Sequence, residues 1–405
     1  MYYQRTIETA IKRIDGSFPV VLLTGPRQVG KTTVLRNIQP SRNYVSLDTL
    51  ANRRLANEDP ALFLQRFPPP VLIDEIQYAP GLFSEIKAVV DEQQKPGMFW
   101  ITGSQKFQLM RNVRESLAGR VGILDLDGLS LPEILQMPSI ETFLPTKSWI
   151  KQRAAQAKDL AEAEIFKIIW RGSYPALYGD HPRDWEDYYS AYLKTYVDRD
   201  LRDLHNSGDE LPFEKLLTLL AARSGQLINY SDLARGIEKS VPTVQKWISI
   251  LRTTGIIYLL PPFSRNLNNR MISLPKIYFM DTGLICYLCR WNSPDVLVRG
   301  NQYGPIFETF VLAEIIKTYL HNGRTPCVFF YRDKEKREID LILEADGKVY
   351  PVEIKTTANP TPAMVKNFSV LQKRKLEVGE GAVICLTPTY LPLTEKVNII
   401  PVTYV

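Results

Sequence analysis

The chain has 405 residues, of which 45% are hydrophobic and 23% are charged. This composition allows two or three ordinary hydrophobic cores and excludes a largely disordered protein. The formal net charge of +6 permits a nucleic acid as a partner without requiring one. No apolar run approaches the ~18 residues of a membrane-spanning helix, and charges interrupt residues 1–14, where a signal peptide would be apolar. We therefore expect a cytoplasmic protein without a membrane partner.

A phosphate-binding loop is predicted near the amino end. Residues 19–24 form an apolar, strand-like run that leads into the pattern Gly-x4-Gly-Lys-Thr and then into a helix. Glycine lets backbone N–H groups approach a phosphate, Lys31 can place its charge between the β- and γ-phosphates, and Thr32 can give its hydroxyl to Mg²⁺. The sequence leaves open whether Arg27 contacts a phosphate or points outward. We expect ATP to be held by Gly25, Pro26, Arg27, Gln28, Val29, Gly30, Lys31, Thr32 and Thr33.

Two acidic residues further along the chain could support hydrolysis. Residues 71–73 read as a buried strand that ends in the adjacent carboxylates Asp74 and Glu75. An acidic strand end is often only a solvated terminus, but after a phosphate-binding loop it predicts a catalytic pair. We expect Asp74 to hold Mg²⁺ through water and Glu75 to orient and deprotonate the attacking water. A third apolar run, 98–102, is followed by Ser104, our candidate for a sensor of the γ-phosphate.

These patterns belong to a longer series that runs through the chain. The series consists of Tyr3-x-Arg5, Gly25 to Thr32, Asp74-Glu75-Ile76-Gln77, Thr102-Gly103-Ser104, Leu117-Ala118-Gly119-Arg120, Arg171 to Pro175, Tyr196 to Leu201, Asp281-Thr282-Gly283 and Glu353-Ile354-Lys355. By this series the chain resembles the widespread prokaryotic family of AAA-type ATPases (AAA_14-like) that carry a C-terminal DUF4143 region. The resemblance covers nearly the full length and implies an α/β fold with a P-loop, AAA+-like parallel sheet.

Arg120 is the candidate for a residue that acts on a second copy of the chain. It ends a basic stretch and directly precedes a strand-like run at 121–126. The arginine finger of AAA+ ATPases has this placement, and its guanidinium completes the nucleotide site of a neighbouring subunit. The resemblance thus implies a homo-oligomer in which Arg120 acts in trans, whereas a solvated basic helix face is the simpler interpretation.

The expected domain order is an ATPase domain at 1–130, a helical connector or lid at 131–208, a winged-helix domain at 209–285 and a PD-(D/E)xK nuclease-like α/β domain at 286–405. In the connector, alanine-rich, charged sequence from Lys151 to Trp170 predicts a surface helix. A second helix is predicted from Trp185 to Leu204, where aromatic residues recur at helical spacing. We expect the connector to transmit changes at the nucleotide site to the rest of the chain.

The third domain is predicted to be a winged helix because three helical stretches precede two short strands, with Ser231 as the expected cap of the second helix. In the third helix, Val244, Ile248 and Leu251 form an inward stripe. The opposite face and the basic residues of the loop between the strands could contact DNA. These residues are Thr243, Gln245, Lys246, Ser249, Arg252, Arg265 and Arg270. Winged helices also serve as protein–protein modules, so the partner stays open.

The C-terminal domain contains a second group of acidic residues. Asp340 lies in a strand-like run, and Glu353 and Lys355 lie on one face of the next. This pattern resembles the core of PD-(D/E)xK nucleases, with Glu308 on a preceding helix as the additional acid. The resemblance implies that Asp340 and Glu353 hold Mg²⁺ or Mn²⁺ against the scissile phosphate, while Lys355 helps to activate water. The same scaffold occurs in proteins that only bind nucleic acid, so cleavage stays open.

Three functions are compatible with these residues. The leading hypothesis is an ATP-hydrolysing protein whose nucleotide state repositions a winged-helix and nuclease-like module on DNA. The second is a slow ATP-dependent switch whose C-terminal half is a catalytically inactive platform for protein interactions. The third makes metal-dependent nucleolysis the main activity and ATP its regulator. Glu75 and Arg120 would decide the turnover of ATP, and Asp340, Glu353 and Lys355 would decide cleavage.

Overall fold

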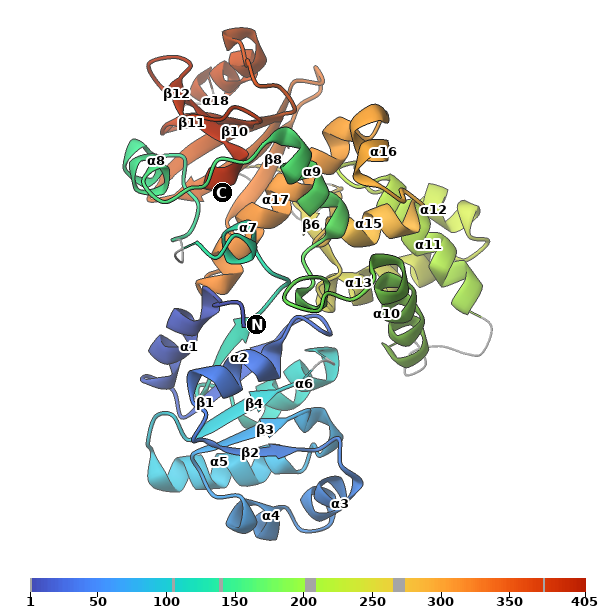
Figure 1. Ribbon diagram of the computed structural model, residues 1–405. Coiled ribbons are helices and arrows are strands. Elements are labelled where there is room, and N and C mark those ends of the chain that lie inside the picture. Colours follow the sequence, from blue (N-terminus) through green and yellow to red (C-terminus); the bar gives the residue numbers. More distant parts are fainter. Residues whose placement is uncertain (1, 104–105, 138–140, 201–208, 265–273, 374–375) are drawn as a thin grey trace.

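The described residues form two large β-sheets joined by a helical region that contains a small two-stranded sheet. The computed structural model describes residues 2–103, 106–137, 141–200, 209–264, 274–373 and 376–405. Figure 1 shows a five-stranded sheet at the bottom of the view, a six-stranded sheet at the top, and helices between them and to the right. In this described part of the chain, no helix is both long enough and apolar enough to cross a lipid bilayer.

The N-terminal sheet is parallel and has the strand order β2-β3-β4-β1-β5. Its strands are β1 (Val20–Thr24), β2 (Asn43–Ser46), β3 (Val71–Asp74), β4 (Phe99–Thr102) and β5 (Val121–Asp125). The inner strands β1, β3 and β4 are buried on both faces, as their near-continuous apolar sequences require. The parallel α/β sheet expected from the sequence is confirmed. All five strands run in one direction, so their carboxyl ends meet at one edge, where ligands bind in open sheets of this kind.

Helices cover both faces of this sheet. They are α1 (Ile7–Asp15), α2 (Lys31–Ile38), α3 (Leu50–Glu58), α4 (Pro60–Arg66), α5 (Leu82–Gln93) and α6 (Lys106–Ser116). Alternate residues of β1 point to opposite faces. Val21 and Leu23 belong to the core cluster that includes α1 and α2, whereas Val20 and Leu22 belong to the cluster that includes α5. The strand that leads into the phosphate-binding loop is therefore held from both sides.

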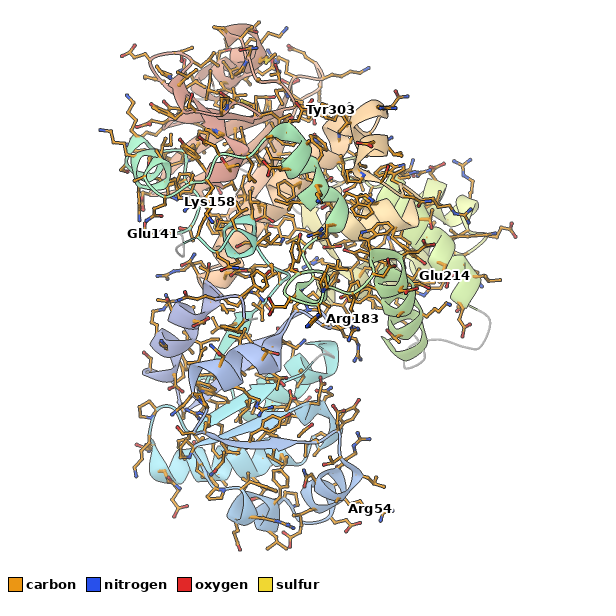
Figure 2. The ribbon with its side chains drawn as sticks, in the orientation of Figure 1. Arg54, Glu141, Lys158, Arg183, Glu214 and Tyr303 are labelled. Carbon is orange, nitrogen blue, oxygen red and sulfur yellow. The ribbon has the colours of Figure 1, made fainter. Side chains whose placement is uncertain are left out.

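The helices of the connector are shorter and more numerous than expected. It contains α7 (Leu131–Ile134), α8 (Lys147–Ala154), α9 (Glu162–Arg171) and α10 (Trp185–Asp200). The single surface helix predicted from Lys151 to Trp170 is wrong, because the chain leaves the helical conformation between α8 and α9. Tertiary contacts override the local helix propensity there. Buried Arg153 donates from Nε to the carbonyl of Tyr404 (2.7 Å), and Lys158, labelled in Figure 2, donates to the carbonyl of Leu135 (2.7 Å).

The next region contains the helices and strands that the sequence predicts. They are α11 (Glu210–Ala222), α12 (Tyr230–Gly236), α13 (Val241–Thr253), β6 (Ile257–Leu260) and β7 (Lys276–Phe279), and β6 and β7 pair antiparallel. The predicted cap of α12, Ser231, is wrong: the cap is Asn229, whose side chain accepts from the backbone N–H of Asp232 (3.1 Å). The inward stripe of α13 is buried as expected.

The C-terminal region contains three helices followed by a mixed sheet. The helices are α15 (Thr282–Leu288), α16 (Pro294–Arg299) and α17 (Tyr303–His321). The sheet has the order β12-β13-β11-β10-β9-β8, with β8 (Val328–Arg332), β9 (Glu338–Ala345), β10 (Lys348–Lys355), β11 (Gly381–Cys385), β12 (Leu391–Pro392) and β13 (Val397–Pro401), and α18 (Ser369–Lys373) separates β10 from β11 along the chain. The strands β8, β9 and β10 form an antiparallel meander, and β11 then pairs parallel with β10.

Two motifs singled out in the sequence meet in the interior and join the connector to α15. The carboxylate of Asp281 accepts hydrogen bonds from the backbone N–H and hydroxyl of Ser173 (2.6 and 2.8 Å), the hydroxyl of Tyr189 (2.7 Å) and the N–H of Leu284 (2.7 Å). A Cβ at Gly172 would lie 2.1 Å from the hydroxyl of Tyr189, so glycine is required there. These contacts make the connector and the following helices one packed unit.

Candidate functional site

The loop between β1 and α2 turns tightly enough to surround an anion. Gly25 and Gly30 have positive φ angles of 139° and 91°, which glycine adopts readily. At Gly25 a Cβ would lie 1.9 Å from the carbonyl oxygen of Leu126, so another residue would displace the backbone. The loop ends at the amino end of α2, where the backbone N–H groups of the first turn and the helix dipole favour negative charge.

Lys31 begins α2, and its side chain is buried against the loop. Its ammonium donates hydrogen bonds to the carbonyl oxygens of Gly25 (3.0 Å) and Pro26 (2.7 Å). Bonds from an ammonium to phosphate oxygens are stronger than bonds to neutral carbonyls. The ammonium is therefore positioned to exchange the loop carbonyls for the phosphates of a nucleotide.

Asp74, at the end of β3, lies beside the first turn of α2. The hydroxyl of Thr32 donates to both carboxylate oxygens of Asp74 (2.9 and 3.0 Å), and the hydroxyl of Tyr44 donates to one of them (3.2 Å). The hydroxyl of Thr102, at the end of β4, also hydrogen-bonds this carboxylate. Burial and the charge of Asp74 raise the pKa of Tyr44 above its ordinary value, so the phenol keeps its proton. The structure thus brings Thr32 and Asp74 together as expected, and adds Tyr44 and Thr102.

Glu75 follows Asp74 in a left-handed conformation, with φ of 56°. A residue with a side chain adopts this conformation at a cost of about 1–3 kcal/mol, which is usually found at functional sites. The backbone N–H of Glu75 donates to the hydroxyl of Thr102 (3.4 Å), and the side-chain amide of Gln77 donates to its carboxylate. A Cβ at Gly103 would lie 2.4 Å from Oε1 of Gln77, so glycine leaves room for this amide. The carboxylate of Glu75 is therefore oriented by its neighbours.

The remaining predicted nucleotide residues have different environments. Val29 is buried, and its carbonyl oxygen accepts a hydrogen bond from Arg5 (2.9 Å). Arg27 is partly buried, whereas Gln28 and Thr33 are exposed. Ser104 lies outside the described residues, so its role as a sensor of the γ-phosphate stays a prediction.

Arg120 lies at the opposite edge of the sheet from the phosphate-binding loop. It directly precedes β5, and the parallel register pairs Val20 with Val121, at the amino ends of their strands. The five residues of β1 separate this edge from the loop by about 16 Å. The guanidinium of Arg120 pairs with Asp91, with Nη2 3.0 Å from Oδ2, and its side chain is about one-third exposed. Arg120 is thus out of reach of the loop in its own chain.

A buried polar network attaches the loop to the carboxyl end of α17. Besides Val29, Arg5 contacts Glu133 of α7, with Nε 2.8 Å from Oε2. The other oxygen of Glu133 lies 3.2 Å from Nδ1 of His321, and Nε2 of His321 accepts from the backbone N–H of Asp127 (3.3 Å). Arg5, Glu133, Asp127 and His321 are all buried. Sequence reasoning named Arg5 only as part of a motif and gave no sign of its partners, which come from distant segments.

The edge of the sheet that holds the phosphate-binding loop also faces α13. A cavity of about 570 Å³ is lined by Gly25 and Pro26 of the loop, by residues 125–127 after β5 and by residues 252–255 at the end of α13. A Cβ at Gly255 would lie 2.9 Å from Cγ of Pro26, so the turn after α13 touches the phosphate-binding loop. Arg252, which the sequence places on a face for DNA, therefore also borders the nucleotide loop.

The predicted acids of the C-terminal sheet are close together. The ammonium of Lys355 lies 2.9 Å from Oδ2 of Asp340 and 2.6 Å from Oε2 of Glu353. Oδ2 of Asp340 also accepts from the backbone N–H of Ile354 (2.8 Å), which fixes β9 against β10. Glu308, on α17, accepts from the hydroxyl of Tyr278 on β7 (2.5 Å).

Burial and mutual repulsion couple these carboxylates. Burial, and then the charge of Asp340, raise the pKa of Glu353 to about 9, and the same two causes raise the pKa of Glu308. Burial lowers the pKa of Lys355 while Asp340 and Glu353 raise it, and the net shift is upward. Within the described ranges, no group of three or more His, Cys, Asp or Glu side chains is arranged to hold a metal ion. The metal site predicted at Asp340 and Glu353 does not fit this arrangement, because Lys355 is bonded to both.

Comparison with known proteins agrees with this architecture. Residues 17–135 match an AAA domain, residues 162–295 match a domain of unknown function (DUF8612), and residues 303–405 match another (DUF4143). A parallel sheet with a glycine-bounded loop after β1 and an acidic end on β3 defines the P-loop ATPase fold. Residues 17–135 are accordingly an AAA-type P-loop domain and residues 303–405 a DUF4143 domain, which confirms these two parts of the resemblance drawn from the sequence.

Relatives with this chain's full layout include uncharacterised proteins of Mycobacterium tuberculosis and Mycobacterium bovis. Each is 28% identical, with 98% of this chain and 83% of the relative covered. Similar solved structures include a Walker-type ATPase of Pyrococcus abyssi, at 15% identity and a TM-score of 0.43, with 71% of this chain and 96% of that chain covered. Another is the ORC2 protein of Aeropyrum pernix in its ADP form, at 13% identity and a TM-score of 0.30, with coverage of 64% and 87%.

Proposed function

We propose that this protein binds ATP with Mg²⁺, hydrolyses it, and uses the nucleotide state to reposition its C-terminal half on DNA. The geometry around Asp74 supports the first part. Thr32 and Asp74 offer the oxygen ligands that Mg²⁺ prefers, and Lys31 is positioned for phosphate. Mg²⁺ would be held by the hydroxyl of Thr32 and, through water, by Asp74, and it would neutralise charge on the phosphates.

Different residues of the chain then have separate roles in hydrolysis. The loop N–H groups and Lys31 bind and orient the phosphates. Glu75 takes the proton of the attacking water, and the amide of Gln77 holds the Glu75 carboxylate in place. Thr102 fixes both acids, because it bonds the carboxylate of Asp74 and the backbone of Glu75.

The contact network between the loop and α17 is the observation that carries the coupling. Arg5 bonds the carbonyl of Val29 in the loop and, through Glu133, is tied to His321 at the carboxyl end of α17. Glu308 lies on the same helix thirteen residues earlier, which is about 20 Å along the axis. A rigid helix thus links the nucleotide loop to the C-terminal acids. Movement of the loop on hydrolysis would be transmitted along it.

DNA is the partner that the exposed face of α13 fits best. Gln245, Lys246, Ser249 and Arg252 are exposed on this face, and their donors suit base edges and phosphates. The basic residues predicted for the loop between β6 and β7, Arg265 and Arg270, lie outside the described residues. Since Arg252 also borders the nucleotide loop, nucleotide and DNA would compete for, or share, the end of α13.

The position of Arg120 supports a homo-oligomer. An arginine at the edge of the sheet opposite its own loop can act on a nucleotide only in a neighbouring subunit. Its present partner, Asp91, is exposed, so the pair can separate at little cost. We assign Arg120 the role of completing the neighbour's site.

ATP turnover with and without DNA tests this proposal. The purified chain is expected to release phosphate from ATP in Mg²⁺, and double-stranded DNA should change the rate. The Lys31→Ala variant should lose both turnover and the heat of ATP binding in calorimetry, because the loop loses the ammonium that is positioned for the phosphates. A turnover that DNA leaves unchanged would favour the slow switch with a protein-binding platform. A Lys31→Ala variant with normal turnover would contradict the assignment of the site.

Metal-dependent nucleolysis regulated by ATP is a second candidate. The order of α17, the meander β8 to β10 and the acids Asp340 and Glu353 favours it. The corresponding prediction is that the wild-type chain nicks supercoiled plasmid in Mn²⁺ only when ATP is present, and that the Asp340→Ala variant does not. If the wild-type chain fails to nick under all these conditions, DNA recognition without cleavage remains.

A further inference from the structure

The hairpin of β6 and β7 places a lysine inside the C-terminal acidic site. The ammonium of Lys276, on β7, lies 2.5 Å from Oε1 of Glu338 and 3.6 Å from Oε1 of Glu308. Only 6% of its side chain is exposed. A lysine is rarely buried to this degree unless carboxylates surround its charge. Lys276 is therefore part of this site, although it comes from the region before α17.

The hairpin is fixed against the sheet on several sides. The backbone N–H of Phe263, after β6, donates to the carbonyl of Phe330 on β8 (2.6 Å), and the N–H of Phe330 donates back to Pro261 (3.1 Å). The ammonium of Lys276 also lies 5.6 Å from the ring centroid of Phe330. Next to it, the hydroxyl of Tyr278 donates to Glu308. The lysine is thus held in place by backbone pairing and does not rest on side-chain contacts alone.

Two ammonium groups already occupy positions among the carboxylates of the site. Glu308, Glu338, Asp340 and Glu353 supply the carboxylates, and Lys276 and Lys355 supply two ammonium groups. Lys355 is bonded to Asp340 and Glu353, and Lys276 is bonded to Glu338 and lies near Glu308. Burial lowers the pKa of Lys276 while Glu308 and Glu338 raise it, and the net shift is upward, so the lysine stays charged.

We propose that Lys276 controls metal access to this site, because its ammonium takes the place of a divalent cation between Glu308 and Glu338. This inference rests on the nuclease-like character proposed for the C-terminal half. A divalent cation brought next to the ammonium would be repelled, and it would find the carboxylates already engaged. Lys276 belongs to the hairpin, whereas Glu308 belongs to α17 and Glu338 to β9, so a shift of the hairpin relative to the sheet would release these two carboxylates from Lys276. Metal binding is then linked to the position of the region that contains α13.

Mn²⁺ titration calorimetry of nucleotide-free protein tests the role of Lys276. All proteins carry Asp74→Asn, so that the phosphate-binding loop does not contribute a metal. With Lys276 present, Mn²⁺ is expected to bind no tighter than about 1 mM, and Lys276→Met should tighten binding at least about tenfold. Methionine keeps most of the side-chain volume and removes the charge. Lys276→Arg restores the charge and should behave like the parent, which a purely structural role for Lys276 would not require.

A second substitution shows whether the Mn²⁺ bound by Lys276→Met lies at the carboxylates that Lys276 contacts. Adding Glu308→Gln to Lys276→Met should abolish the tighter binding, whereas Glu92→Gln, an exposed change on α5, should not. Unchanged affinity in a folded Lys276→Met variant, or a gain that survives Glu308→Gln, would overturn the proposal. If Lys276→Met does not fold, Lys276→Gln keeps hydrogen-bond donors for Glu308 and Glu338 and takes its place. If neither folds, micromolar Mn²⁺ binding by the parent that Glu308→Gln removes would equally overturn it.

This test is separate from the test of the proposed function. Mn²⁺ affinity is measured without ATP or DNA, so loss of the ATPase assignment leaves the result for Lys276 intact. If Lys276→Met binds Mn²⁺ tightly and still does not nick DNA, nucleolysis is contradicted while control of metal access by Lys276 stands.

Discussion

Replacing Glu75 with glutamine is expected to lower ATP turnover by about 10²- to 10⁴-fold while ATP stays bound. The carboxylate is the only feature that the change removes, because glutamine has the same shape. Gln77 and Thr102 hold this residue, and neither contact belongs to the phosphate-binding loop. ATP affinity should therefore remain within a few-fold of the wild-type value. Phosphate release under saturating ATP, together with ATP calorimetry, measures the two effects separately.

A matched change on an exposed residue provides the control for Glu75. Glu92→Gln, on α5, removes one carboxylate from the same domain and should leave turnover unchanged. Mixing Glu75→Gln subunits with Arg120→Ala subunits should restore part of the activity if Arg120 acts in trans, since the site of an Arg120→Ala subunit keeps its own Glu75 and receives Arg120 from a Glu75→Gln neighbour. Normal turnover of Glu75→Gln would show that another group deprotonates the water.

The nucleotide loop could be predicted from the sequence because its chemistry is contiguous. Gly25, Lys31 and Thr32 lie within a single turn between a strand and a helix, and local spacing fixes their relation. Predicting the position of Asp74 required one further inference, namely that a parallel sheet brings the carboxyl ends of β1 and β3 to the same edge. Apolar runs of this length predict such a sheet. The contact between Thr32 and Asp74 follows from these two facts.

The partners of these residues could not be predicted in the same way. Tyr44 reaches Asp74 from the edge strand β2, and Thr102 reaches it from β4, which depends on the strand order. The sequence around Thr102 did contain an indication, since Thr102 ends an apolar run at the same edge as Asp74, but the residue predicted for this position was Ser104. No pattern in the sequence indicated that Lys276 lies among the C-terminal acids. It is one lysine in a short strand, and only the packing of the β6–β7 hairpin on β8 places it among the acids.

The largest expected effect on stability comes from Arg5. In Arg5→Met, Glu133 would remain buried without the guanidinium, and the carbonyls of Val29, Asp127 and Gly128 would lose their donors. Breaking a buried ion pair by removing one partner costs about 3–5 kcal/mol. We expect the first unfolding transition in urea to move to lower concentration by a corresponding amount, and ATP affinity to fall because the loop loses its anchor at Val29.

A half-exposed pair supplies the comparison for Arg5. Arg223 lies 2.6 Å from Asp232, with both side chains more than one-third exposed, so Arg223→Met should cost less than about 1 kcal/mol. Equal losses of unfolding free energy in Arg5→Met and Arg223→Met would show that the network around Arg5 stabilises the fold no more than an exposed ion pair does.

The pH dependence of unfolding identifies Glu133 as the residue that Arg5 stabilises. Burial acts to raise the pKa of Glu133, but Arg5, His321 and hydrogen bonds outweigh it, and the net shift is downward from the ordinary value of 4.5. A carboxyl group whose folded-state pKa is lowered stabilises the fold fully above its unfolded pKa and loses this contribution as the pH falls further. Acidification below pH 4.5 should therefore destabilise the wild-type chain more steeply than Glu133→Gln, which has no proton to take up at this position. Parallel acid profiles for the two proteins would mean that Glu133 is not charged in the fold, and the link from the nucleotide loop to α17 would then lose its ionic basis.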